Sequence, residues 1–386
     1  MMRRSTVLDP RATQRILFVA LAIGSVGGCG PTVMTPRSIP GPVASQTTTV
    51  VTPAPSVQGG LPERLNDKDY WKLETDISEP GGYFRIEDNY TSNEMEIGQL
   101  YAMLREGHVD GDVYMGVGPE QNFTYIAATR PRLAFITDIR RGNLHLHLLY
   151  KALFEISNTR ADFVARLFSR KRPAGLTSTS TALELMSAYI RVAPDDEAGF
   201  RVNLKAVTDH LTKTRGLPLG RDELTGIEYV YENFHRFGPG INYTSSIGRG
   251  GGAITYAALM ATRDTTGKER SYLASEETFG WIKAMQTKNL IIPIVGDFAG
   301  PKALREVGAF VKEHGATVTA FYVSNVEDYL RTNGVWQRFC ANVATIPIDT
   351  SSLFIRPGNR IAIPIGNVLD ATFSSMAAET ASCAAK

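Results

Sequence analysis

The first candidate for chemistry is a glycine turn followed at a distance by an acidic residue. Residues 112–122 read Asp-Val-Tyr-Met-Gly-Val-Gly-Pro-Glu-Gln-Asn, a short apolar run that leads into Gly116 and Gly118, and Asp138 lies 20 residues after Gly118. Glycines let a backbone turn tightly and approach a ligand closely. In nucleotide-binding α/β folds, an acid at this spacing accepts hydrogen bonds from ribose hydroxyls. The pattern predicts a nucleoside site, and the alternative is a plain turn with an aspartate that starts a helix.

Two residues of the turn indicate which ligand it suits. The third glycine of the dinucleotide-binding pattern would fall at Gln121, and Glu120 lies where a pyrophosphate would meet the positive end of the following helix. A carboxylate at that position repels phosphate. The sequence therefore disfavours NAD and FAD, which leaves a dehydrogenase as a distant alternative. It favours a ligand without phosphates, such as S-adenosylmethionine.

Other candidate sites have simpler explanations. His145 and His147 are two positions apart on an expected helix and do not face one another, so no metal site is predicted. Residues 248–252 resemble a phosphate-binding loop but lack its Lys-Ser/Thr ending, which favours a flexible loop. Cys340 fits a small packed hydrophobic residue, although in an oxidising compartment it could pair with Cys383.

Apolar runs that alternate with helical patterns must position the turn and the acid. Strands that are apolar throughout, with helices between them, indicate an α/β fold with a mostly parallel, doubly wound sheet covered on both faces. The expected strands are residues 113–117, 133–137, 290–295, 317–323 and 343–348, with a further late strand at 360–365. The expected helices between them are residues 123–129, 143–157, 301–314 and 326–332.

The middle of the chain, residues 158–285, has a different character. Four helices are expected there, at 162–168, 182–190, 201–213 and 223–234, joined by links rich in Gly, Pro, Ser and Thr. We interpret this segment as a largely helical insertion in one α/β domain of residues 61–375. Its apolar stripes are core by default, and the sequence does not choose between a lid and a partner surface. The small-residue tail, 376–386, is expected to be frayed and flexible.

The chain begins with the features of an exported lipoprotein. Basic residues up to Arg15 precede the apolar run 16–23, and the segment Val26-Gly27-Gly28-Cys29 resembles the lipobox in which a cysteine is acylated before cleavage. We expect a signal peptide over residues 1–28 and a lipid on Cys29, the alternative being an ordinary signal peptide with an incidental cysteine. Pro, Ser and Thr in residues 29–60 predict a disordered tether spanning roughly 30 Å. The protein should then be anchored to a membrane of the cell envelope, on the periplasmic side.

The balance of charge argues against one class of partner. The chain has 41 basic and 39 acidic residues, and loss of residues 1–28 would leave 37 basic and 38 acidic ones. A nucleic-acid-binding domain needs a strongly basic surface. We therefore expect no nucleic-acid partner.

Five long stretches of the chain carry a family resemblance and together cover most of residues 61–365. They are residues 81–94, 116–155, 270–279, 289–330 and 339–347. They resemble uncharacterised bacterial proteins, several of them lipoproteins, whose fold is similar to that of S-adenosylmethionine-dependent methyltransferases. The resemblance implies a fold but no established reaction. Tyr114 departs from the pattern, because many such methyltransferases carry an acid two residues before the first glycine.

The same resemblance implies a set of binding residues at one edge of the sheet. Asp138 would hold the ribose, and the methionine side would be lined by Gly116, Gly118, Gln121 and Asn122. Gly296, Asp297 and Asn325 would face the same edge, together with Ser324 and Glu327. Asn89, Ser92, Asn93 and Glu94 precede the first strand and could cover the pocket. Ordinary turn and helix-cap chemistry is the alternative for these outer residues.

Two hypotheses follow for the function. The first is a membrane-anchored, methyltransferase-like domain that binds S-adenosylmethionine or a related nucleoside, with an unknown reaction. The second is a non-enzymatic envelope lipoprotein for binding or scaffolding, in which the nucleotide site is degenerate. Export counts against the first, because S-adenosylmethionine is made in the cytoplasm. The sequence leaves both open.

Overall fold

A mostly parallel sheet organises the folded part of the chain. The computed structural model describes residues 60–107, 109–245, 253–356 and 373–384. In these residues six strands form one sheet in the order β3-β2-β1-β4-β5-β6. The first five strands run parallel and β6 pairs antiparallel with β5. The strands are β1 (Val113–Gly116), β2 (Leu133–Asp138), β3 (Ile291–Val295), β4 (Val318–Tyr322), β5 (Leu353–Ile355) and β6 (Phe373–Ser375).

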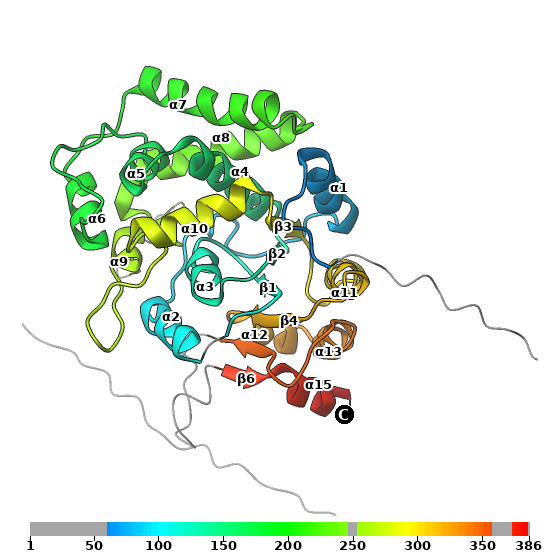
Figure 1. The fold of residues 1–386 in the computed structure, drawn as a ribbon. Helices are drawn as coiled ribbons and strands as arrows, with labels where there is room; N and C mark the ends of the chain where they lie inside the picture. Colours follow the sequence, from blue (N-terminus) through cyan, green and yellow to red (C-terminus); the bar gives the residue numbers. More distant parts are fainter. Residues whose placement is uncertain (1–59, 108, 246–252, 357–372, 385–386) are drawn as a thin grey trace, which may run out of the picture. The chain divides into compact units, whose positions relative to one another are not determined.

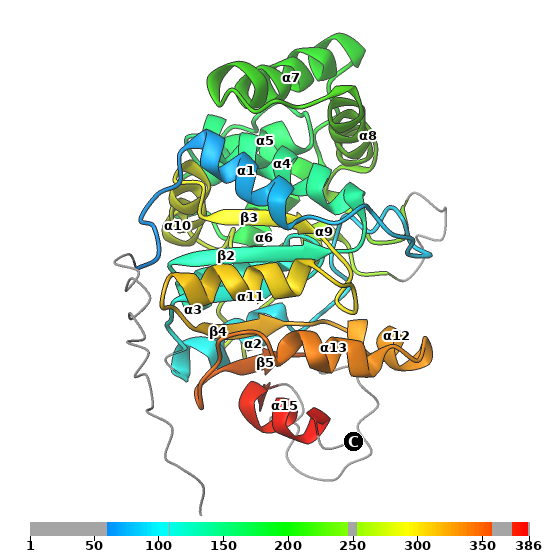
Figure 2. The same cartoon turned by 90° about the vertical axis from the view of Figure 1, so that its right-hand side faces the viewer.

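Helices cover both faces of this sheet, as the sequence predicts for strands that are apolar throughout. Helices α1 and α11 lie on one face, and α3 and α10 lie on the other (Figure 1; Figure 2). The α/β fold class expected from the sequence is confirmed. The helices on and around the sheet are α1 (Asp67–Ile77), α2 (Ile97–Glu106), α3 (Gln121–Thr129), α4 (Arg141–Ile156), α10 (Glu276–Thr287), α11 (Ala303–Glu313), α12 (Val326–Thr332), α13 (Trp336–Val343) and α15 (Met376–Ala384).

The segment between α4 and α10 is helical, and several of its helices pack against α4 (Figure 1). The predicted helices are all present, with ends shifted by up to four residues. A one-turn π-helix, His210–Thr214, continues one of them, and a short 3-10 turn, Gly238–Gly240, follows another. They are α5 (Arg160–Leu167), α6 (Ala182–Ile190), α7 (Glu197–Asp209), α8 (Arg221–Phe237) and α9 (Tyr256–Met260).

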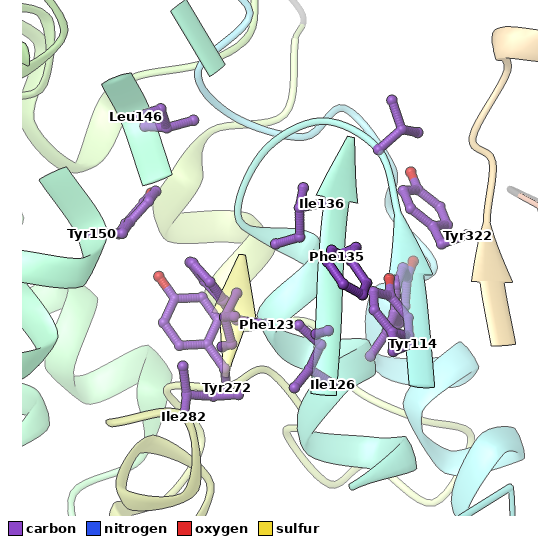
Figure 3. Close-up of a cluster of buried hydrophobic side chains, with 14 of the residues drawn as sticks. Tyr114, Phe123, Ile126, Phe135, Ile136, Leu146, Tyr150, Tyr272, Ile282 and Tyr322 are labelled. Atoms are coloured by element: carbon purple, nitrogen blue, oxygen red, sulfur yellow. The ribbon is translucent and has the colours of Figure 1, made fainter. Parts of the chain in front are cut away.

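Aromatic side chains pack α3 against α4 and against the chain that precedes α10 (Figure 3). The ring of Phe123 on α3 lies 5.2 to 5.5 Å from the rings of His147, Tyr150, Phe154 and Tyr272, all in edge-on orientations. Edge-to-face pairs stabilise by about 0.5–1.5 kcal/mol each beyond the burial of their area. Since the glycine turn leads directly into α3, this cluster also helps to hold the turn in place.

The C-terminal segment corrects two expectations. Residues Met376–Ala384 form helix α15 instead of a frayed tail, and a disulfide joins Cys340 of α13 to Cys383 of α15, with the two Cα atoms 5.7 Å apart. Cys340 is therefore more than a packed hydrophobic residue. A nine-residue helix is too short to be stable alone, so its stability comes from contacts that the sequence does not display.

A buried ion pair reinforces that attachment. Arg356 follows β5 and donates through Nε and Nη2 to both carboxylate oxygens of Glu327 in the first turn of α12, at 2.6 and 2.7 Å. Its Nη2 also donates to Glu379 of α15, at 2.7 Å. Bidentate guanidinium–carboxylate pairs fix orientation as well as distance. One guanidinium thus connects α15, β5 and α12.

One predicted strand is wrong. Val343 ends helix α13, and residues 344–348 form no strand although they are apolar. A short apolar run does not distinguish a strand from the end of a buried helix. The predicted strand at 360–365, the loop at 248–252 and the segment 1–59, with the proposed signal peptide and nearly all of the tether, lie outside the described residues. In the part of the chain that is described, no helix has the length and apolar character needed to cross a bilayer.

Candidate functional site

The glycine turn after β1 is built around one asparagine. Asn122 in the first turn of α3 donates through Nδ2 to the carbonyl oxygens of Val117, Gly118 and Pro119, at 2.9, 3.2 and 2.8 Å. Gly118 has a positive φ of 79°, which favours glycine. A Cβ atom on Gly116 would lie 2.0 Å from Asn122 Oδ1. Gly116 and Asn122 therefore stabilise the turn through their packing and hydrogen bonds, and neither is among the residues that line the cavity described next.

A cavity of about 190 Å³ lies at the carboxyl edge of the sheet. Its walls come from the segments that follow β1, β2, β3 and β4, from the chain that precedes α2, and from α12. Six of the predicted site residues line it, and the outer residues before α2 and Ser324 do so too. From the predicted set, the lining residues are Gly118, Gln121, Asp138, Gly296, Asp297 and Asn325, with Asn89, Ser92, Asn93, Glu94 and Ser324.

The carboxylate of Asp138 is already paired within the protein. Its Oδ1 accepts hydrogen bonds from the backbone N–H and Nε of Arg140, at 2.8 and 3.0 Å, and its Oδ2 accepts from Nη2 at 2.7 Å. The Arg140 Nη1 donates to the carbonyl oxygens of Glu87 and Asn89. Both ionic side chains are almost fully buried. A ribose that approached Asp138 would share this carboxylate with the guanidinium.

Glu94 is the second buried carboxyl group at the cavity. Its Oε1 accepts hydrogen bonds from the Tyr322 hydroxyl and from Ser324 Oγ, the latter at 2.8 Å, and Tyr125 approaches Oε2 at 3.4 Å. Burial raises the pKa of Glu94 above its usual value, and these three hydrogen bonds lower it in part. The Tyr322 hydroxyl also accepts from Gln121 Nε2 at 3.1 Å. Glu94, Tyr322 and Gln121 thus form one buried polar wall.

Glu120 differs from its expected role. Its carboxyl group accepts hydrogen bonds from the backbone N–H of Ser92, at 3.1 and 3.3 Å, and it is absent from the cavity lining. Burial raises the pKa of Glu120 to about 8, so the group is mostly protonated at neutral pH. Glu120 fixes the segment before α2 against α3, and its repulsion of phosphate is weaker than the sequence suggests.

The two histidines of α4 contact different parts of the structure. His147 Nε2 lies 2.9 Å from the carbonyl oxygen of Gly118, and burial lowers the pKa of His147 to about 4. The neutral ring can therefore donate to the turn. His145 packs instead against Gly226 of α8, where a Cβ atom would lie 2.0 Å from the imidazole. Within the described ranges no three metal-ligating side chains come together.

Glu79 fastens the chain before α2 to the loop after β3. Its carboxylate accepts hydrogen bonds from the backbone N–H groups of Asp297, Lys302 and Ala303, at 3.1, 2.8 and 2.9 Å. Negative side chains are favoured at a helix N-terminus, and here the acid comes from a distant part of the sequence. This contact positions Asp297 at the cavity.

Several lining residues were not expected from the sequence. Arg140 follows Asp138 by two positions, so its pairing with that acid could have been considered. Tyr322 ends an apolar run and reads as a core residue. Phe84 and Tyr329 meet edge-on with ring centroids 5.2 Å apart, and no local pattern marks that contact.

Comparisons with known proteins identify the family but add no activity. No curated protein matches the chain at a significant level. A family model with the description "Domain of unknown function (DUF7790)" matches residues 90–385, which include all six strands and most of the cavity lining. The chain therefore belongs to the DUF7790 family.

Proposed function

We propose that this domain is methyltransferase-like and binds S-adenosylmethionine or a related nucleoside in the cavity at the carboxyl edge. The observation that carries the proposal is the position of the cavity. Successive strands progress from β1 to β3 on one side of β1, and the chain then crosses to β4 on the other side. In open α/β sheets, ligands bind outside the carboxyl ends of the strands where the order reverses. Residues that follow β1 and β4 both line the cavity.

The residues at the cavity fit a ligand without phosphates. Arg140 is the only cationic side chain among the described lining residues, and Asp138 already pairs with it. Gly118 and Gln121 would hold the methionine side, Asp138 the ribose, and Asp297 and Asn325 the far wall. When bound, S-adenosylmethionine would supply an activated methyl group.

A specific observation favours the second candidate function. Both oxygens of Asp138 are engaged by Arg140, so the acid that would hold the ribose is partly neutralised. This is what a degenerate nucleotide site in a non-enzymatic binding or scaffolding protein would contain. The two candidates differ in whether a nucleoside stabilises the folded state.

Thermal melting of the full chain tests this proposal. Addition of S-adenosylmethionine at 100 times its dissociation constant should stabilise the folded protein by about 2.7 kcal/mol, while NAD should not. Asp138→Ala should abolish the shift, because it removes the acceptor for the ribose hydroxyls. Asp349→Ala makes the same change in a turn outside the cavity and should leave the shift intact. Absence of a shift with S-adenosylmethionine, S-adenosylhomocysteine and NAD alike would favour the non-enzymatic candidate.

We also propose that the protein is exported and held at a membrane of the cell envelope by a lipid on Cys29. The Cys340–Cys383 disulfide supports an oxidising compartment, because cytosolic proteins rarely keep such bonds. Cys29→Ser should release the protein from the membrane fraction into the soluble fraction. Mass spectrometry that finds an unmodified mature Cys29 would reject the lipid anchor.

A further inference from the structure

The polar wall of the cavity contains hydrogen-bond acceptors that lack donors. Gln121 is only 2% exposed, and its Nε2 donates to Tyr322 and to the carbonyl oxygen of Val117. Its Oε1 has no hydrogen-bond partner among the described residues. Leaving a buried acceptor unsatisfied destabilises the folded state. Gln121 lines the cavity, so a small rotation of its amide would present this unpartnered acceptor to a ligand that brings a donor.

Glu94 supplies further acceptor capacity at the same wall. From the described part of the chain, its Oε1 receives two hydrogen bonds, whereas Oε2 receives only the long 3.4 Å contact from Tyr125. A carboxylate oxygen can accept two hydrogen bonds. The Tyr322 hydroxyl, which bonds both Glu94 and Gln121, brings the two side chains to one place.

The cavity lining carries more acidic than basic groups, which also favours a positively charged ligand. Among the described lining residues, Glu94, Asp138 and Asp297 contribute three carboxyl groups, against the single guanidinium of Arg140. Because Arg140 is bonded to Asp138 and to two carbonyl oxygens, it offsets one carboxylate and has little left for a ligand. The remaining imbalance is negative. Tyr329 lines the same cavity, and aromatic faces attract cations. The ring of Phe84, which also lines the cavity, already faces the Arg140 guanidinium at 5.9 Å.

We propose that Glu94 and Gln121 form a subsite for a positively charged hydrogen-bond donor on the ligand, so that the cavity selects cationic nucleosides over neutral and phosphorylated ones. This proposal rests on the proposed function, because it assumes a nucleoside in the same cavity. With the ribose at Asp138, this subsite would take the 5′ substituent, since Gln121 and Glu94 line the same cavity. An ammonium group there donates to Gln121 Oε1 and Glu94 Oε2, and its charge compensates the buried carboxylate. Burial alone disfavours the ionised form of Glu94.

Three nucleosides that differ only at the 5′ position test the selectivity by calorimetry at pH 7 on the full chain. 5′-Amino-5′-deoxyadenosine carries the cation, adenosine is neutral and adenosine 5′-monophosphate is anionic. The amino compound should bind roughly tenfold or more tightly than adenosine, as expected for a charge-assisted hydrogen bond. The monophosphate should bind most weakly.

Two variants locate the effect. Glu94→Gln keeps the shape and removes the charge, so the affinities for the amino compound and adenosine should converge. Glu74→Gln makes the same change at a buried glutamate of α1 that does not line the cavity, and the preference should persist. Equal affinities of the wild-type protein for adenosine and its amino analogue would overturn this inference and leave the proposed function standing. Failure of all three nucleosides to bind would overturn both. The wild-type comparison decides even if Glu94→Gln does not fold.

Discussion

Loss of the Cys340–Cys383 disulfide is expected to lower the free energy of unfolding by about 4 kcal/mol. The bond closes a loop whose ends are 43 positions apart, and a cross-link of that span removes a corresponding amount of chain entropy from the unfolded state. Helix α15 depends on this attachment, because nine residues do not sustain a helix alone. Guanidinium titrations of the oxidised protein and of the Cys340→Ala/Cys383→Ala variant measure the difference.

A reductant provides the matched control. It should destabilise the wild-type protein to about the level of the double variant and should leave the double variant itself unchanged. Hydrogen exchange at the amides of α15 should accelerate in both cases. If the unfolding midpoint of the wild-type protein does not move on reduction, the disulfide does not stabilise the fold.

Replacement of Arg160 by methionine should destabilise the protein by about 3–5 kcal/mol. The Arg160 side chain at the start of α5 is only 2% exposed, and its guanidinium pairs with Glu276 of α10. It also donates to the carbonyl oxygens of Leu273, Ser178 and Ser180. Methionine has a similar length but no donors, so the buried carbonyl group of Leu273, two partly buried carbonyl groups and the Glu276 carboxylate would lose the guanidinium.

Arg172→Met is the matched control for this change. Arg172 pairs with Asp162 on α5, but its side chain is 43% exposed. Exposed pairs contribute at most about 1 kcal/mol, so this variant should unfold almost as the wild type does. Arg160→Lys should recover only part of the loss, since an ammonium group cannot reach the positions that the planar guanidinium serves. Equal effects of the two methionine variants would contradict the role of Arg160.

The sheet could be predicted from the sequence because its main strands are apolar along most of their length. Strands β1, β2 and β3 are buried throughout, so each appears as a continuous apolar run that ends at a glycine or an aspartate. The three-residue strands β5 and β6 give no such signal. The strand predicted at 343–348 is wrong because apolar character alone does not exclude the end of a helix.

The candidate site could be predicted at the level of the backbone and not at the level of the side chains. The ends of parallel strands meet at one edge, which is enough to bring Gly118, Asp138 and Asp297 to one cavity. The pairing of Asp138 with Arg140 depends on rotamers that a pattern does not specify. The contact of Glu94 with Tyr322 joins residues 228 positions apart, and no periodicity links them. The sequence predicts that Gly116 contacts a ligand, whereas in the structure Gly116 leaves room for the Asn122 side chain. Residue spacing does not reveal that contact.

The contacts of Arg356 impose an order on assembly. Helix α12 forms one wall of the cavity, yet its first turn is held by a guanidinium that also binds Glu379, near the end of the chain. During synthesis Glu379 emerges after the six strands of the described residues, so a nascent polypeptide can complete the strands around the glycine turn before Glu379 can bind Arg356. A chain that stops between β6 and Glu379 would therefore contain these strands but lack that contact.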